Sequence, residues 1–310
     1  MFSILLGMSA IIIAGIGWRL LLGSQKAEAV RGHLTRGVYD IFLPALVLHV
    51  MWQTEVNLNT VRLPLVAIAC ILLSLLTAAL VYQEGRWFPS GFRSKRAAVG
   101  ALLLAASFGN FTYLGLPVLT QTFGPDMQSV AIYFDLFAST PLLFTVGVML
   151  ARKYGANHEP IGQVPGFLKV PAVWAAIAGV MLSAMHIGIP GWLKESLGVL
   201  GAAVVPLMLL SIGMALRWQS GWAARIPVLL PMLAIQLLWM PLIAWAMSIG
   251  VGMPAELLAP VIVEAAMPCM VLGLVICDRF KLDSGLYAEA VTVSTALSLF
   301  TLPMWLHLSS

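Results

Sequence analysis

The amino-acid sequence predicts an all-α polytopic membrane protein: ten transmembrane helices in a 5+5 inverted repeat, with broken, crossing helices 4 and 9. Three observations support this: an apolar composition, ten apolar runs and a one-sided distribution of Lys and Arg. Of the 310 residues, 60% are hydrophobic and 10% are charged, and the mean hydropathy is +0.95. A soluble domain is about 45–50% apolar and about 25% charged, so lipid is the solvent expected for this chain and a soluble enzyme is excluded.

The apolar runs are bounded by charged or Gly/Pro-rich loops. Each is near the roughly 20 residues that a helix needs to cross the hydrocarbon core of a bilayer. The first run has no basic residue before it, so we expect a retained helix and not a signal peptide. The predicted spans are 2–22, 35–53, 62–83, 97–122, 127–150, 166–187, 192–216, 226–249, 255–277 and 284–307.

The basic residues fix the expected orientation. Of the 17 Lys and Arg residues, 15 fall in alternate loops, and only Arg62 and Lys194 fall on the other side. The positive-inside rule then puts both termini outside, in the periplasm if the chain sits in a bacterial cytoplasmic (inner) membrane. The net charge of +4 therefore reflects membrane topology, and we expect lipid and no nucleic acid as a partner.

The two halves of the chain resemble each other weakly, which predicts one transporter domain built from repeats 1–152 and 166–310 around a cytoplasmic linker, 153–165. The matches, in the same order, are LPALVLHVM with VPLMLLSIGM, RLP with RIP, and TFGPD with RFKLD. Five helices per half is an odd number, so the second copy enters the membrane from the opposite side. Inverted repeats of this kind build secondary transporters whose sites lie at discontinuous helices near the midplane.

Helix breakers interrupt two predicted spans at matching places. The fourth span has Gly109-Asn110 and Gly115-Leu116-Pro117, and the ninth has Pro268 a turn after Glu264. Such breaks free backbone groups, present half-helix N-termini to anions and present C-terminal carbonyls to cations. We therefore predict that substrate is bound by residues at the two breaks, namely Asn110, Tyr113, Gly115, Pro117, Met267, Pro268 and Cys269. Lone prolines such as Pro141 and Pro241 are expected only to kink their helices.

Three polar side chains within the spans are candidates for ion coupling: Glu264, Asp135 and Ser107. An intramembrane charge costs at least a few kcal/mol, so Glu264 needs a cationic, protonic or hydrogen-bonding partner. The repeat pairs Glu264 with Ser107. A sodium site formed by these two residues is the one metal site that the sequence leaves open. A protonated Glu264 bonded to nearby backbone is the alternative. Asp135 is expected near mid-depth with Ser139 one turn on along the same face.

No motif of an enzyme appears in the sequence. HExxH, GxSxG, paired CxxC and Walker-type glycine loops are absent, the five histidines are scattered, and the three cysteines lack metal-ligand spacing. We expect no enzyme and no cofactor, with a proton or sodium as the coupling ion.

Several segments resemble the auxin efflux carrier family: NFTYLGLPVLTQTFG, IFLPALVLHVM, VIVEAAMPCMV and STALSLFTLPMW. The family includes plant PIN-type carriers and bacterial malonate or malate permeases, and the short central loop is similar to that of the bacterial members. The resemblance implies the ten-helix fold shared with bile acid sodium symporters, in which helices 1, 2, 6 and 7 form a scaffold that moves against a core of the other six.

The resemblance also implies residue roles. Asn110, Gly115 and Pro117 match the helix 4 element, and Pro268 matches the helix 9 proline. Glu264 is similar to the glutamate that serves sodium in bile acid symporters, but the following AAMPCM lacks the amide found there.

These observations together predict a secondary active transporter that moves a small organic anion, a mono- or dicarboxylate, by alternating access. The alternatives are a sodium-coupled carrier like the bile acid symporters, or a transporter-like sensor that binds ligand without translocating it. A membrane-embedded enzyme would need a nucleophile and base pair, which the sequence lacks. The sequence leaves open whether the chain forms a homodimer.

Overall fold

A computed structural model describes residues 2–83, 95–156, 166–216 and 225–309. Three of the predicted inner basic residues, Arg86, Arg93 and Arg217, and most of the predicted linker lie outside these ranges. Within them the chain is helical and forms no strand, apart from one isolated antiparallel bridge between Gly109 and Cys269.

Six helices of the described chain are long and apolar enough to cross a membrane. They are Ser24–Gln53, Asn59–Tyr82, Pro125–Tyr154, Gly191–Ala215, Ile226–Gly250 and Ser284–Ser309. Two further apolar stretches, Gly7–Leu22 and Pro171–Ala184, are shorter. Large apolar side chains such as Leu21 (87% exposed) and Phe300 (76% exposed) lie on the outer surface, where lipid would solvate them. An all-helical protein with apolar spans is thus confirmed.

Residues 2–53 and 166–216 hold the helices α1 (Phe2–Leu22), α2 (Ser24–Gly37), η1 (Val38–Phe42), α3 (Leu43–Gln53), η6 (Gly166–Lys169), α10 (Pro171–Ala184), α11 (Gly191–Ala202) and α12 (Val204–Ala215). The other helices of the first half are α4 (Asn59–Gln83), α5 (Lys95–Ser107), η2 (Phe111–Gly115), α6 (Leu116–Phe123), η3 (Pro125–Met127), α7 (Gln128–Phe134), η4 (Asp135–Ser139), α8 (Thr140–Leu142), η5 (Leu143–Gly147) and α9 (Val148–Tyr154). Those of the second half are α13 (Ile226–Ala234), η8 (Ile235–Trp239), α14 (Met240–Gly250), α15 (Ala255–Ala265), α16 (Gly273–Phe280) and α17 (Ser284–Ser309).

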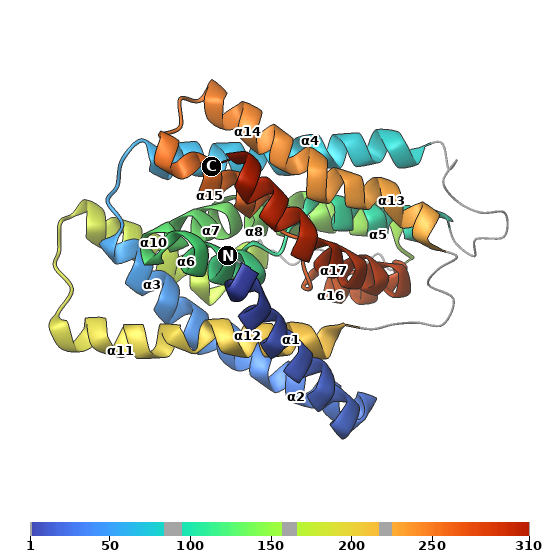
Figure 1. Ribbon diagram of the computed structural model, residues 1–310, viewed down its shortest axis with the longest axis horizontal. Coiled ribbons are helices and arrows are strands. Elements are labelled where there is room, and N and C mark those ends of the chain that lie inside the picture. The colour runs from blue at the N-terminus through green and yellow to red at the C-terminus, as the bar shows by residue number, and fades with distance from the viewer. Residues whose placement is uncertain (1, 84–94, 157–165, 217–224, 310) are drawn as a thin grey trace.

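The helices pack as two groups (Figure 1). In the first, α3 contacts α10 and α11, and α12 contacts α1 and α2. In the second, α4 contacts α5 and α14, and α17 contacts α5 and α15. Fewer contacts join the groups, and they include those of η2 with α12, η4 with α10 and α3 with α7. This grouping matches the scaffold and core that the family resemblance implies.

Four prolines within the spans follow π-helical turns. The segments η1, η2, η4 and η8 each end two residues before a proline, namely Pro44, Pro117, Pro141 and Pro241. A proline ring clashes with the carbonyl of the preceding turn, and a wider turn moves that carbonyl away. The helices therefore continue through these prolines in a shifted register.

The expected second interruption of the fourth span, at Gly115–Pro117, is not found. The chain runs without a break from η2 into α6, and Pro117 occupies the first turn of α6. A proline at that position needs no N–H partner, and the π-helical turn before it relieves the clash. The span breaks only at residues 108–110, between α5 and η2, and the ninth span breaks at residues 266–272, between α15 and α16.

Candidate functional site

The two helix breaks, residues 108–110 and 266–272, meet inside the protein; we call this contact the crossing. The backbone N–H of Asn110 donates to the carbonyl of Pro268 at 2.7 Å, and the N–H of Met270 donates to the carbonyl of Phe108 at 3.0 Å. Gly109 and Cys269 lie opposite each other in the resulting bridge. The repeat that pairs Ser107 with Glu264 would match Gly109 with Ala266, so the observed pairing lies three residues further along the second half.

Other backbone groups freed at the crossing have protein partners. The Gln236 side-chain amide donates to Met267 O at 2.8 Å, and the Tyr287 hydroxyl donates to Met270 O at 2.8 Å. The N–H of Cys269 donates to the Ser294 hydroxyl at 3.2 Å. Buried backbone groups need such partners in a medium without water. The breaks are thus sealed by protein along most of their length.

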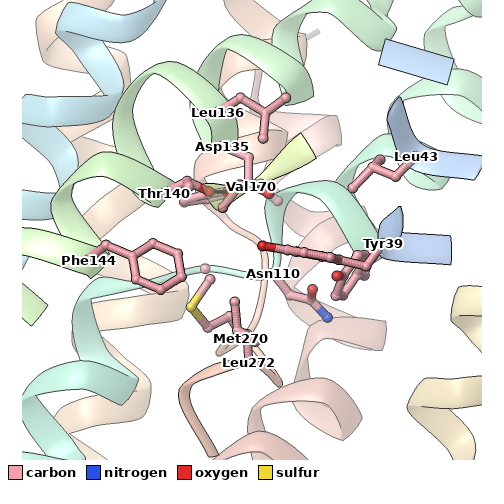
Figure 2. A pocket seen from close by; sticks show the side chains of 13 residues that line it. Tyr39, Leu43, Asn110, Asp135, Leu136, Thr140, Phe144, Val170, Met270 and Leu272 are labelled. Atoms are coloured by element: carbon pink, nitrogen blue, oxygen red, sulfur yellow. Dashed lines mark hydrogen bonds between the residues drawn. The ribbon is translucent and has the colours of Figure 1, made fainter. Parts of the chain in front are cut away.

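A small cavity of about 30 Å³, the crossing cavity, lies beside this bridge. It is roughly the size of two water molecules or one carboxylate group. Asn110 and Tyr39 lie on one side of it, and Thr140 and Phe144 lie on the other (Figure 2). The Asn110 side chain is 3% exposed and its amide nitrogen has no hydrogen-bond partner. A buried donor without a partner is costly, so this amide is available to a ligand oxygen.

Asp135 also lines the crossing cavity, and two hydroxyl groups hold its carboxylate. Thr112 donates to one oxygen, and Thr140 donates to the other at 2.9 Å. The expected neighbour on this face, Ser139, is one turn away in an α-helix, but η4 is π-helical and brings the residue five positions on to the same face. The prediction of Ser139 was therefore wrong by one residue, because Pro141 shifts the register.

Glu264 lies outside the crossing cavity, enclosed at 0% exposure. Neither carboxylate oxygen has a hydrogen-bond partner, and the group packs against Gly115. An unpaired charge at this burial is unfavourable by several kcal/mol, so the group needs a proton or a bound cation. Within the described residues, no three His, Cys, Asp or Glu side chains gather as metal ligands.

The other predicted site residues have varied surroundings. Tyr113 lines the crossing cavity, whereas Met267, Pro268 and Cys269 contribute backbone groups that other residues already bind. Ser107 is fully buried, and its hydroxyl donates to the Leu103 carbonyl at 2.9 Å. That local bond to the preceding turn makes Ser107 a weaker partner for Glu264 than the repeat suggests.

Sequence reasoning missed four residues that shape the site: Tyr39, Thr112, Thr140 and Gln236. Gln236 left a signal, since it is the lone amide in an apolar span and intramembrane polar groups mark functional or structural contacts. Tyr39 comes from η1 in the first helix group, and its proximity to Asn110 is purely tertiary. The threonines gave no α-helical spacing that would have paired them with Asp135.

Residues 166–306 match the family model described as membrane transport protein. The chain is similar to membrane transporters. An uncharacterized transporter of Methanothermobacter thermautotrophicus is 27% identical over 301 residues, covering 96% of this chain and 95% of that protein.

Two further relatives match a smaller share of the chain, and one of them is also less identical in sequence. An uncharacterized transporter of Methanocaldococcus jannaschii is 27% identical over 80% of this chain and 79% of its own length. The uncharacterized transporter YfdV of Escherichia coli K12 is 20% identical over 70% of each chain. Together with the apolar helices, these similarities support an integral membrane transport protein.

Proposed function

We propose that this chain is a secondary active transporter that moves a small organic anion, a mono- or dicarboxylate, by alternating access. The same proposal includes the ten-span 5+5 inverted repeat and a place in a bacterial inner membrane with both termini outside. It also includes kinship with the bacterial malonate or malate permease-like members of the auxin efflux carrier family. The similarity to membrane transport proteins supports the general function.

The observation that carries this proposal is the unpartnered Asn110 amide beside the crossing. The helix that starts at η2 begins directly after Asn110, and Asn110 and Phe111 both line the crossing cavity, so the positive end of the helix dipole lies beside it. Donors without internal partners, held at the end of a helix dipole, bind an anion. Substrate carboxylate at Asn110 is the arrangement these groups favour.

Asp135 supplies the proposed coupling. A substrate carboxylate in the crossing cavity would share it with the Asp135 carboxylate, and two like charges at close range in a low dielectric repel strongly. The anion therefore binds best when a proton or a sodium ion neutralises Asp135. Binding of anion and cation then depend on each other, which couples the two fluxes.

Glu264 is the second candidate for the coupling ion, and it favours a sodium-coupled carrier as the runner-up. Both of its oxygens lack partners and would be ligands for a hard cation. Ser107 would contribute its hydroxyl oxygen, which can accept while it donates to Leu103.

The test is uptake of labelled mono- and dicarboxylates into proteoliposomes under imposed pH or sodium gradients. Asn110→Ala is expected to reduce uptake at least tenfold while the protein stays monodisperse. Gln121→Ala is the control, because this exposed amide lies on the same half-helix, α6. Unchanged kinetics in Asn110→Ala would remove the site assignment.

The same assay separates the coupling ions and the sensor alternative. Uptake driven by pH and abolished in Asp135→Asn supports proton coupling there, whereas sodium-driven uptake abolished in Glu264→Gln supports the sodium carrier. Binding of a carboxylate without counterflow of any carboxylate would replace the carrier by a sensor.

A further inference from the structure

A second cavity, of about 240 Å³, lies between the two helix groups near Arg31 and Arg36 of α2. Residues from α12 line one side of it, and residues that include Val271 and Val275 line the other. The volume is below the roughly 300–1,000 Å³ of drug-sized sites and suits a smaller ligand. Tyr39, Tyr113 and Leu272 line both this space and the crossing cavity, so the two are neighbours that share one wall.

The polar lining of the second cavity is built around Arg31. The side chain is 16% exposed and one guanidinium nitrogen pairs with Glu28, but its Nε has no hydrogen-bond partner. Beside it, the hydroxyls of Thr35 and Ser211 are 2.9 Å apart and join α2 to α12. A buried guanidinium N–H without an acceptor is unfavourable, and an anionic oxygen satisfies it.

The charges facing the cavity are positive. Arg36 also lines it, is 84% exposed and lies 3.5 Å from Asp40. The acidic partners of these arginines, Glu28 and Asp40, are not among the residues that line the cavity, so the charged side chains of its lining are both positive. A cleft with one sign of charge and apolar walls raises the local concentration of ions of opposite sign.

We propose that this cavity is an antechamber that binds the carboxylate of the transported anion at Arg31 Nε before the anion reaches the crossing cavity. The shared wall of Tyr39, Tyr113 and Leu272 separates the two stations. The identity of the ligand as transported anion rests on the proposed function; the binding of an anionic group at Arg31 does not.

The test measures charge selectivity in the antechamber without knowledge of the substrate. Thr35→Cys places a thiol in its wall, and the three native cysteines are buried, so the unsubstituted protein reports background labelling. In phosphatidylcholine nanodiscs, where both faces are accessible, an anionic sulfonatoethyl and a cationic trimethylammonioethyl methanethiosulfonate are compared. The anionic reagent should react faster, and Arg31→Gln should lower the anionic-to-cationic rate ratio roughly tenfold.

Two matched variants keep the result interpretable. Arg31→Lys retains the charge and should retain most of the ratio, which excludes loss of folding as the cause. Lys26→Gln removes one positive charge from an exposed position on the same helix and should leave the ratio unchanged. An equal effect of Lys26→Gln and Arg31→Gln would overturn the proposal, because it would reduce the selectivity to a general surface potential.

An anionic lipid headgroup offers the same chemistry as a soluble carboxylate, so the nanodisc composition is the second arm. If phosphatidylglycerol slows the anionic reagent in the Arg31 protein but not in Arg31→Gln, the headgroup occupies the site and the proposal fails. If the ratio persists in both lipids, the soluble anion is supported. The labelling does not depend on transport. If the anionic-to-cationic rate ratio is intact but no uptake is found, the carrier is rejected and the anion site at Arg31 is kept.

Discussion

The carboxylate of Glu264 lies so close to Gly115 that a methyl group in place of the glycine hydrogen would lie 2.3 Å from Oε1 and 2.4 Å from Oε2. The missing side chain of Gly115 leaves room for the buried Glu264 carboxylate, and we call this position the Gly115 seat. The need for this room explains why a glycine stands in a helix. Its backbone angles, φ −62° and ψ −51°, are right-handed helical values that any residue adopts, so conformational freedom is not the reason.

Gly115→Ala is expected to displace the Glu264 carboxylate and to reduce gradient-driven uptake at least tenfold. A contact of 2.3 Å is far inside van der Waals range, and the end of the glutamate side chain is the part that can move. Proteoliposome uptake measures the effect. In a Glu264→Gln background the same change should add little, because the two residues form one unit.

Gly17→Ala is the matched control for this change. Gly17 lies in α1 with no atom within 4 Å of the added methyl group, so alanine should leave uptake unchanged and raise helix stability by up to about 1 kcal/mol. A loss of uptake in Gly17→Ala comparable to that of Gly115→Ala would contradict the specific role of the Gly115 seat.

Thr140→Val is expected to lower the free energy of unfolding by about 1–3 kcal/mol, since it leaves one Asp135 oxygen without its donor. Thermal unfolding in detergent, followed by size-exclusion chromatography, measures this. Thr140→Ser keeps the hydroxyl and should unfold close to the unsubstituted protein. Destabilisation by serine as large as that by valine would contradict this expectation, because serine keeps the hydroxyl donor to Asp135.

Pro141→Ala is expected to let η4 relax toward the α-helical register and to separate Thr140 from Asp135. With no ring to clash with the preceding carbonyl, the wider turn loses its cause. The readout is a double-mutant cycle: Thr140→Val should cost about 1–3 kcal/mol alone and close to nothing beside Pro141→Ala. Full additivity would show that the π-helical turn persists without proline.

Gln236→Leu is expected to destabilise the protein by about 1–3 kcal/mol, because the Met267 carbonyl at the crossing loses its donor. Thermal unfolding is again the measurement. Gln53→Leu is the comparison, since that exposed amide donates to the His49 carbonyl at the end of α3 and should change stability by less than about 0.5 kcal/mol. Similar effects of the two substitutions would argue against a special role of Gln236.

The helical architecture and both breaks were predictable from the sequence. Apolar runs and loop charges locate spans, and Gly109 and Pro268 mark places where continuous helix is unfavourable. The meeting of Asn110 with Pro268 was also expected, because matching interruptions in two halves imply a shared site.

What sequence alone could not supply depends on register and on side-chain competition. Pro117 and Pro141 look like breaks or kinks in one dimension, but each can be absorbed by a wider turn, and only the packed structure decides. The sequence pairs Ser107 with Glu264, but the Ser107 hydroxyl donates its hydrogen bond to the local Leu103 carbonyl. Tyr39 and Arg31 enter through helix packing, for which one sequence holds no signal.

The crossing cavity has room for roughly one carboxylate group, about 30 Å³, and a whole dicarboxylate is larger. If a dicarboxylate is the substrate, as proposed, it binds molecules in which Tyr39, Tyr113 or Leu272 has moved, and the measured dissociation constant is the intrinsic one divided by the fraction in that wider form. Weak apparent affinity in this protein would then be a property of a narrow resting state and would coexist with a tightly complementary site. Shortening one of the three side chains of the shared wall should strengthen substrate binding even though it removes a contact.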